Sequence, residues 1–149
     1  MITRLEKMRV ADDKEVRYFI RGEEELPMNE LLGQTLTIDF GGKITCMNCD
    51  KVIRKSFQGF CYRCFTEAPQ AAECIIRPEL CEAHLGKGRD VEWEGSHHNQ
   101  PHFVYLALSS DVKVGVTRDT QIPTRWIDQG ASSAIIFADT PYRQLAGQI

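Results

Sequence analysis

The sequence lacks any hydrophobic run that approaches the roughly 20 residues a helix needs to span a bilayer. Its first residues, Met-Ile-Thr-Arg-Leu-Glu-Lys, carry charges with no apolar stretch behind them, so we expect no signal peptide. The net charge of −3 lacks the basic excess that marks a general affinity for nucleic acid. These absences predict a cytoplasmic protein without a membrane partner, in which any nucleic-acid contact depends on a local patch.

What is present is an ordinary soluble composition with an unusual use of cysteine. The 149 residues are enough for one domain or two small ones with a modest core, and 42% of them are hydrophobic. Six cysteines in a chain without an export signal favour a reducing compartment. In such a compartment thiols bind metal and do not form cross-links.

Two Cys-x-x-Cys pairs form the strongest motif. Cys46 and Cys49 make the first pair, and Cys61 and Cys64 make the second. A tight turn brings both sulfurs of each pair to one metal, about 2.3 Å away, so the motif predicts a four-thiolate zinc site in a zinc ribbon or treble-clef-like knuckle. Residues 51–53 can leave on a strand and residues 57–60 can turn back. The alternative is a pair of disulfides or a redox motif, although a redox motif needs only one such pair.

The residues between and within these pairs form a local basic patch. The cations outnumber the single acid, Asp50, and aromatic side chains are interleaved with them. The cations are Lys51, Arg54, Lys55 and Arg63, and the aromatics are Phe57, Phe60 and Tyr62. This mixture can meet phosphates and bases, and the competing interpretation is a solvated ribbon face.

The first forty-five residues predict a small sheet that supports the zinc site. Alternating patterns over residues 4–10 and 16–21 predict two strands joined by a turn at residues 11–14. A hairpin is expected from residues 35–40 and 43–46, because Gly41-Gly42 suits a two-residue turn with positive φ.

A second cluster follows the first. Cys74, Cys81 and His84 have the spacing Cys-x6-Cys-x2-His, and His98 is the favoured fourth zinc ligand. His97 and His102 are its competitors. Four protein ligands would make such a zinc structural, and three with a water could make it catalytic. Alternatively, the two cysteines are buried thiols and the histidines lie on a solvated loop.

The last third predicts the order β-β-α-β-α. Strands are expected at residues 103–108, 112–117 and 134–138. The first helix is capped by Asp119 or Thr120, has Pro123 in its first turn and stops at Gly130. The second begins at Thr140-Pro141 and ends on an apolar position without a capping residue, as expected of a fragment. The predicted fold is α+β, divided into a β-rich part (1–45), a zinc-binding region (46–102) and this incomplete α+β unit (103–149).

The last unit resembles a GIY-YIG nuclease domain in the order Val104-Tyr105-Leu106, Lys113-Val114-Gly115 and Arg125. The resemblance implies that Tyr105 helps to activate water and that Arg125 contacts phosphate. Lys113 stands where the family has a second tyrosine, as in lysine-bearing variants of the motif. On strand patterns alone, Tyr105 is a half-buried core tyrosine, and Arg125 is an ordinary helix arginine stacked on Trp126.

The resemblance also exposes a missing residue. The family holds a divalent metal with a glutamate, whereas this sequence has no glutamate after Glu94. Without that carboxylate, Mg²⁺ or Mn²⁺ has no anchor beside the scissile phosphate, so this polypeptide alone is expected to be inactive. Arg118, after the second strand, could reach a phosphate or simply face water.

Nearly the whole chain also resembles an uncharacterised bacterial family, domain of unknown function 2797. The matching phrases are Gln58-Gly-Phe-Cys-Tyr-Arg-Cys-Phe65, Cys74-Ile-Ile-Arg-Pro-Glu-Leu-Cys81 with Ala83-His84, Val112-Lys-Val-Gly-Val-Thr-Arg118 and Pro123-Thr-Arg-Trp-Ile-Asp-Gln-Gly-Ala131. The resemblance implies a tandem layout and little about activity. We therefore expect a zinc-containing protein that binds DNA or RNA. The alternatives are a metal-dependent endonuclease or phosphodiesterase in a longer chain, and a structural zinc module for protein interaction.

Overall fold

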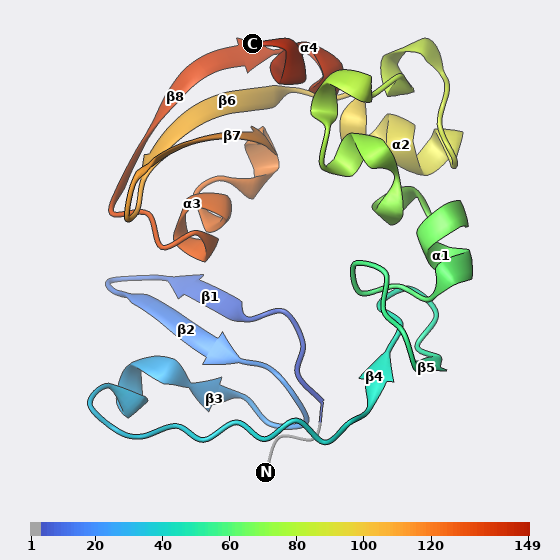
Figure 1. The fold of residues 1–149 in the computed structure, drawn as a ribbon. Coiled ribbons are helices and arrows are strands. Elements are labelled where there is room, and N and C mark those ends of the chain that lie inside the picture. Colours follow the sequence, from blue (N-terminus) through green and yellow to red (C-terminus); the bar gives the residue numbers. More distant parts are fainter. Residues whose placement is uncertain (1–3) are drawn as a thin grey trace.

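The computed structural model describes residues 4–149, which form a mixed α+β protein with three small antiparallel sheets (Figure 1). The first sheet has the order β1-β2-β3, with β1 at Arg9–Asp12, β2 at Val16–Ile20 and β3 at Leu26–Pro27. The first strand thus begins at Arg9 and not at Arg4, and the turn follows Asp12. Within residues 4–149, no helix combines the length and apolar composition needed to cross a bilayer.

The sequence led us to expect that the first sheet supports the cysteine pairs, but it lies against the C-terminal part of the chain instead. β1 faces α3 (Thr124–Asp128) in Figure 1. The Tyr18 hydroxyl donates a hydrogen bond to the Ile127 carbonyl at 3.3 Å, and Lys7 pairs with Asp128 at 2.6 Å. Contacts between residues far apart in sequence decided this placement.

The hairpin expected between residues 35 and 46 does not form. Residues 35–40 have no strand structure, and β4 (Ile44–Thr45) pairs instead with β5 (Val52–Ile53). Gly42 does adopt a positive φ of 76°, but Phe40 and its apolar neighbours on this segment are exposed. A strand is stabilised by cross-strand and same-face packing, which residues 35–40 do not find. The chain turn at the first cysteine pair brings β5 beside β4.

The middle of the chain consists of short helices. It begins with α1 (Tyr62–Glu67) and ends with α2 (Val91–His98), and four 3₁₀ turns lie between these two α-helices in the sequence. These turns are η2 (Pro69–Ala71), η3 (Glu73–Ile75), η4 (Pro78–Leu80) and η5 (Ala83–Leu85), and a further one, η1 (Met28–Leu31), follows β3. Proline opens η2 and η4, where its missing N–H costs no hydrogen bond. The Asp90 side chain accepts a hydrogen bond from the Trp93 N–H and starts α2.

The core of this middle region is built from small residues and thiols. One buried cluster contains Cys46, Cys64 and Phe60 with two alanines, and the other contains Cys74 and Cys81 with two alanines. Such clusters bury little apolar area, so they contribute little hydrophobic stabilisation. A region of this kind needs another source of stability, and a bound metal is one.

The C-terminal unit follows the predicted order of elements. β6 (His102–Leu108), β7 (Val112–Arg118) and β8 (Ser133–Thr140) form a sheet of order β7-β6-β8. A 3₁₀ turn, η6 (Asp119–Gln121), and α3 connect β7 to β8, and α4 (Arg143–Gln148) follows. Alternating strands and turn residues are local signals, which explains why the elements were found with their ends displaced by a few residues.

Candidate metal centres

The four cysteines of the two Cys-x-x-Cys pairs converge on one point, which we call the first centre. The Sγ atoms of Cys46, Cys49, Cys61 and Cys64 all lie within 4.8 Å of one another, and all are free thiols. The Sγ atoms of Cys49 and Cys61 are 3.9 Å apart. Four sulfurs at about 2.3 Å from a tetrahedral zinc would be about 3.8 Å apart. The first centre therefore has the donor set and the spacing for one zinc ion, as predicted.

The turn of each pair is fixed by backbone hydrogen bonds. In the first turn, the Cys46 N–H donates to the Lys51 carbonyl at 2.9 Å, and the Asp50 N–H donates to the Cys46 carbonyl at 3.0 Å. In the second, the Cys61 sulfur caps α1 by accepting the Cys64 N–H at 3.4 Å. The Met47 N–H donates to the Gly59 carbonyl at 2.9 Å and joins the two halves. These hydrogen bonds shape the two turns so that their four sulfurs face one another.

The thiols of the first centre differ in acidity. Burial alone would raise the pKa of Cys46, but hydrogen bonds from backbone N–H groups outweigh it and lower that pKa to about 6. The hydrogen bond from the Asn48 amide lowers the pKa of Cys64, but burial and the three neighbouring thiols outweigh it, and together they raise that pKa to about 12. Four thiolates cannot coexist at this distance without a cation, so a divalent metal is the counter-charge that the group needs.

Cys74, Cys81 and His98 form the second centre. Their ligand atoms all lie within 4.8 Å of one another, and all three side chains are buried. The Nδ1 atom of His98 is 3.9 Å from the Cys74 sulfur and 3.5 Å from the Cys81 sulfur. Two thiols and one imidazole are donors that zinc accepts. The second centre therefore can hold a metal with three protein ligands.

Burial controls the charge of this centre. It lowers the pKa of His98 to about 4, with Arg143 adding to the effect, so the imidazole is neutral and able to coordinate. It also raises the pKa of Cys74 to about 12, and the nearby Cys81 and Glu94 add to the shift. Arg143 donates hydrogen bonds to the carbonyls of Cys74 and Ile75 at 3.0 and 2.8 Å, which holds the η3 segment against α4.

The other predicted histidines are placed elsewhere. The His84 ring stacks on Tyr142 with 4.3 Å between ring centroids, and His84 is outside the group of three. His97 stacks on Trp93. His102 is fully buried at the start of β6 and donates from Nδ1 to the Gln100 carbonyl at 2.7 Å. The structure thus brings His98 to the two cysteines and does not bring His84.

The basic patch around the first centre is smaller than its sequence suggests. Lys51, Arg54 and Lys55 are exposed and make no ion pair within residues 4–149, whereas Arg63 is paired with Glu67 at 2.9 Å. The Lys55 amine lies 5.0 Å from the centre of the Phe57 ring. Among the aromatics, Phe60 belongs to the buried cluster and Phe57 packs between Tyr62 and Phe65. Only Tyr62, which is 67% exposed, offers an open ring.

The residues singled out by the nuclease resemblance are not gathered at a surface. Tyr105 is fully buried, opposite Gly115 on β7, and its hydroxyl has no hydrogen-bond partner among the described residues. Its ring lies edge-on to Trp126. Lys113 on β7 and Arg125 on α3 are exposed, and Arg118 pairs with His102 in the sheet.

Two residues near the centres were not found from the sequence. Glu94 is buried on α2, and its Oε2 lies 3.9 Å from the His98 Nδ1. The spacing Glu-x-x-x-His places both on one face of a helix and could have revealed it. Arg89 donates to the carbonyls of Phe65 and Ala68 at 2.8 and 3.0 Å, and its N–H donates to Glu94. No sequence signal predicts such a long-range contact.

Comparisons with known proteins identify one family. Residues 33–149, well over half of the chain, match the sequence model of a family described as a protein of unknown function, DUF2797. Neither the curated proteins nor the solved structures contain a match to this chain. The matched range includes both cysteine centres and the C-terminal sheet.

Proposed function

This chain belongs to the family of proteins of unknown function DUF2797, and we propose that it is a zinc-containing module that binds a single strand of DNA or RNA. The observation that carries the proposal is a group of side chains on the first centre, which we call the knuckle surface. It consists of Lys51, Arg54, Lys55 and Tyr62.

The knuckle surface combines charge and stacking. Its three cations have no carboxylate partner within residues 4–149, so phosphates would not have to displace an existing ion pair. The exposed Tyr62 ring supplies a face on which a base can stack, and such stacking tolerates any sequence. Because the whole chain has a net charge of −3, its surface as a whole does not attract nucleic acid, and we expect the contacts to be confined to this patch.

Zinc has a structural role in this proposal. The four thiolates occupy every position of a tetrahedral ion, which leaves none for substrate. The ion fixes the two turns that carry the knuckle surface. All six thiols are free, in accord with a reducing compartment such as the cytoplasm.

Fluorescence anisotropy with labelled single-stranded DNA and RNA tests this function. Replacing Lys51, Arg54 and Lys55 together by alanine should reduce the slope of log affinity against log salt by about 2, because each lost phosphate contact removes about 0.7. Tyr62→Ala should weaken binding by about 1–3 kcal/mol through lost stacking. Arg17→Ala is the matched control, because that exposed arginine already pairs with Asp13 and lies on β2.

Equal losses of affinity for Arg17→Ala and for the triple variant would remove the knuckle surface as the binding site. No binding to any strand at low salt would reject the proposed function. The cysteine centres would then support a module for protein interaction.

A second candidate is a metal-dependent phosphodiesterase with a GIY-YIG-like unit. The cross-strand pairing of Tyr105 with Gly115, followed by Arg125 on the next helix, favours it. Tyr105 would have to leave its buried position to reach water, and Lys113 and Arg125 would supply charge to the phosphate. The buried hydroxyl is the reason why we rank binding above cleavage.

Cleavage assays with Mg²⁺ or Mn²⁺ on single- and double-stranded DNA and RNA test this candidate. Tyr105→Phe and Arg125→Ala should each abolish any cutting if the candidate is correct. If the protein only binds, Tyr105→Phe should leave affinity unchanged. It should also leave stability unchanged or slightly raised, because it removes a buried hydroxyl without a partner.

A further inference from the structure

The two centres differ in the number of protein ligands. Four sulfurs surround the first, whereas the second gathers only Cys74, Cys81 and His98. Zinc sites with four protein ligands are structural, and sites with three keep a position for water or substrate. The identity of the fourth donor therefore decides what the second centre can do.

Three nearby side chains could close the second centre, and two of them are engaged elsewhere. His84 is stacked flat on Tyr142. His102 lies outside the group of three, but its Nδ1 donates to the Gln100 carbonyl and its buried Nε2 has no hydrogen-bond partner among residues 4–149. His102 is therefore the main competitor for the fourth position, and the His102→Gln variant below decides between it and a water. Glu94 is also outside this group, and its Oε1 accepts the Arg89 N–H at 2.7 Å.

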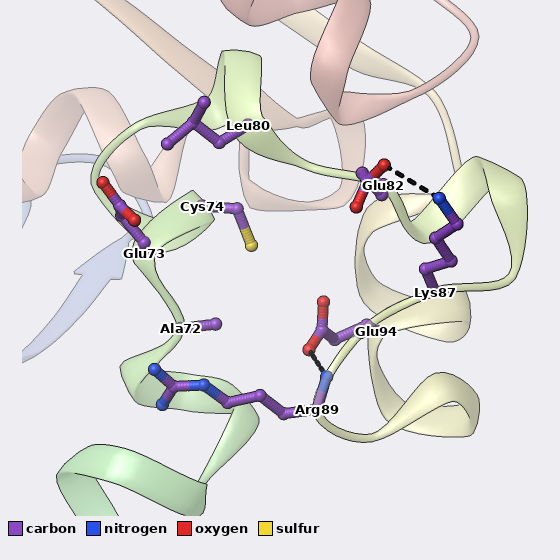
Figure 2. A pocket seen from close by; sticks show the side chains of 9 residues that line it. Ala72, Glu73, Cys74, Leu80, Glu82, Lys87, Arg89 and Glu94 are labelled. Atoms are coloured by element: carbon purple, nitrogen blue, oxygen red, sulfur yellow. Dashed lines mark hydrogen bonds and ion pairs between the residues drawn. The ribbon is translucent and has the colours of Figure 1, made fainter.

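A pocket adjoins the second centre at Cys74. Cys74 and Glu94 both line a cavity of about 250 Å³, together with Leu80, Glu82 and Lys87 among others. Figure 2 shows the Cys74 thiol and the Glu94 carboxylate pointing into it. The volume is slightly below the usual range of about 300–1,000 Å³ for ligand pockets, so a small ligand is the suitable occupant.

The charges of the pocket are largely paired within its walls. Lys87 pairs with Glu82 at 3.2 Å, and the Arg89 side chain is bound to the carbonyls at the end of α1. The carboxylate of Glu94 fills the space beside Gly88, where a Cβ atom would lie 2.6 Å from Oε2. Its position is therefore fixed by the Arg89 N–H and by the adjoining glycine. No cation remains free to capture an anion, so a ligand would bind here chiefly through the metal.

We propose that Cys74, Cys81 and His98 hold a zinc ion whose fourth coordination position faces this pocket and carries an exchangeable water. Glu94, with Oε2 at 3.9 Å from the ligating His98 nitrogen, accepts a hydrogen bond from that water. The site takes small molecules that offer one anionic nitrogen, oxygen or sulfur donor to the metal. This inference concerns the second centre only and does not depend on nucleic-acid binding.

Cobalt substitution of the full chain tests the open position, because the absorption of Co²⁺ reports its coordination. The protein loaded with about two Co²⁺ ions per chain should show a saturable change when sodium azide is added. His98→Ala should lose the second ion together with the azide response, and the first centre then serves as an internal control. A lack of any azide response in the doubly loaded protein would show a closed site and overturn the proposal. Binding of one ion only to the native chain would overturn it as well.

Three further variants identify a hidden fourth ligand without relying on His98→Ala to fold. His84→Gln and His102→Gln should keep both ions and the azide response. Glu94→Gln should keep the resting spectrum and strengthen azide binding several-fold, because a negative charge beside the anion is removed. Loss of an ion or an altered resting spectrum in any of the three would make that residue a ligand and overturn the open position.

Discussion

Gly115→Ala should destabilise the C-terminal sheet, because the glycine makes room for a buried tyrosine. A Cβ atom at this position would lie 2.5 Å from the Tyr105 hydroxyl oxygen and 2.8 Å from its Cε1, with Cζ nearer still. Tyr105 is fully buried and cannot swing into solvent. Either its ring or the β6–β7 pairing must therefore shift.

The expected cost is the difference between two terms. Overpacking a buried site costs about 1–3 kcal/mol. Replacing a glycine restricts the unfolded chain and returns about 0.4–1 kcal/mol. The net loss should be about 1–2 kcal/mol, or a factor of roughly 5–30 in the unfolding equilibrium.

Urea unfolding in excess zinc, followed by tryptophan fluorescence, measures this loss. Gly41→Ala is the control, because a Cβ there meets no atom within 4 Å, and its effect should stay within about 0.5 kcal/mol. In a Tyr105→Leu background, Gly115→Ala should cost much less, since the ring is gone. An equal cost in both backgrounds would refute the clash as the cause.

Three other predictions concern the middle region. Zinc removal by a chelator should expose the amides of residues 46–98 to hydrogen exchange while the C-terminal sheet stays protected, because the buried clusters of the middle region are mainly cysteine and alanine. In Cys64→Ser, the amides around the first centre should stay exposed to exchange until the zinc concentration is far above the one that protects the native chain. Uniform exchange along the chain would contradict this. Arg89→Ala should cost about 1–2 kcal/mol in urea unfolding, because two carbonyls lose a charged donor. Arg77→Ala, which removes only exposed ion pairs, should cost less than about 1 kcal/mol, and equal effects would contradict the role of Arg89.

The predictions that succeeded rest on short-range signals. The Cys46/Cys49 and Cys61/Cys64 spacings are set by turns that close within a few residues, so the convergence on one centre could be predicted. The C-terminal order β-β-α-β-α follows from alternation and from turn residues. The hairpin at residues 35–46 failed although its glycine turn was present, because turn chemistry does not supply a packing partner.

The candidate site was harder to predict where its residues come from distant segments. Cys74 and Cys81 were recognised and His98 was favoured over His97 and His102, but the exclusion of His84 and the position of Glu94 beside His98 on α2 come only from the fold. Tyr105 was placed on the correct strand, yet its complete burial depends on α3 and Trp126.

The first centre, the kind of each C-terminal element and the family of the chain could be read from the amino-acid sequence, because these depend on local spacing and on direct similarity. The fold was needed to show that His84 stays outside the second centre, that Glu94 lies beside it, and that Arg63 and Phe60 do not contribute to the predicted basic patch. These outcomes depend on burial and on pairing between side chains whose partners are chosen by packing. The spacing of residues along the chain does not predict which side chains become buried or which partners they contact.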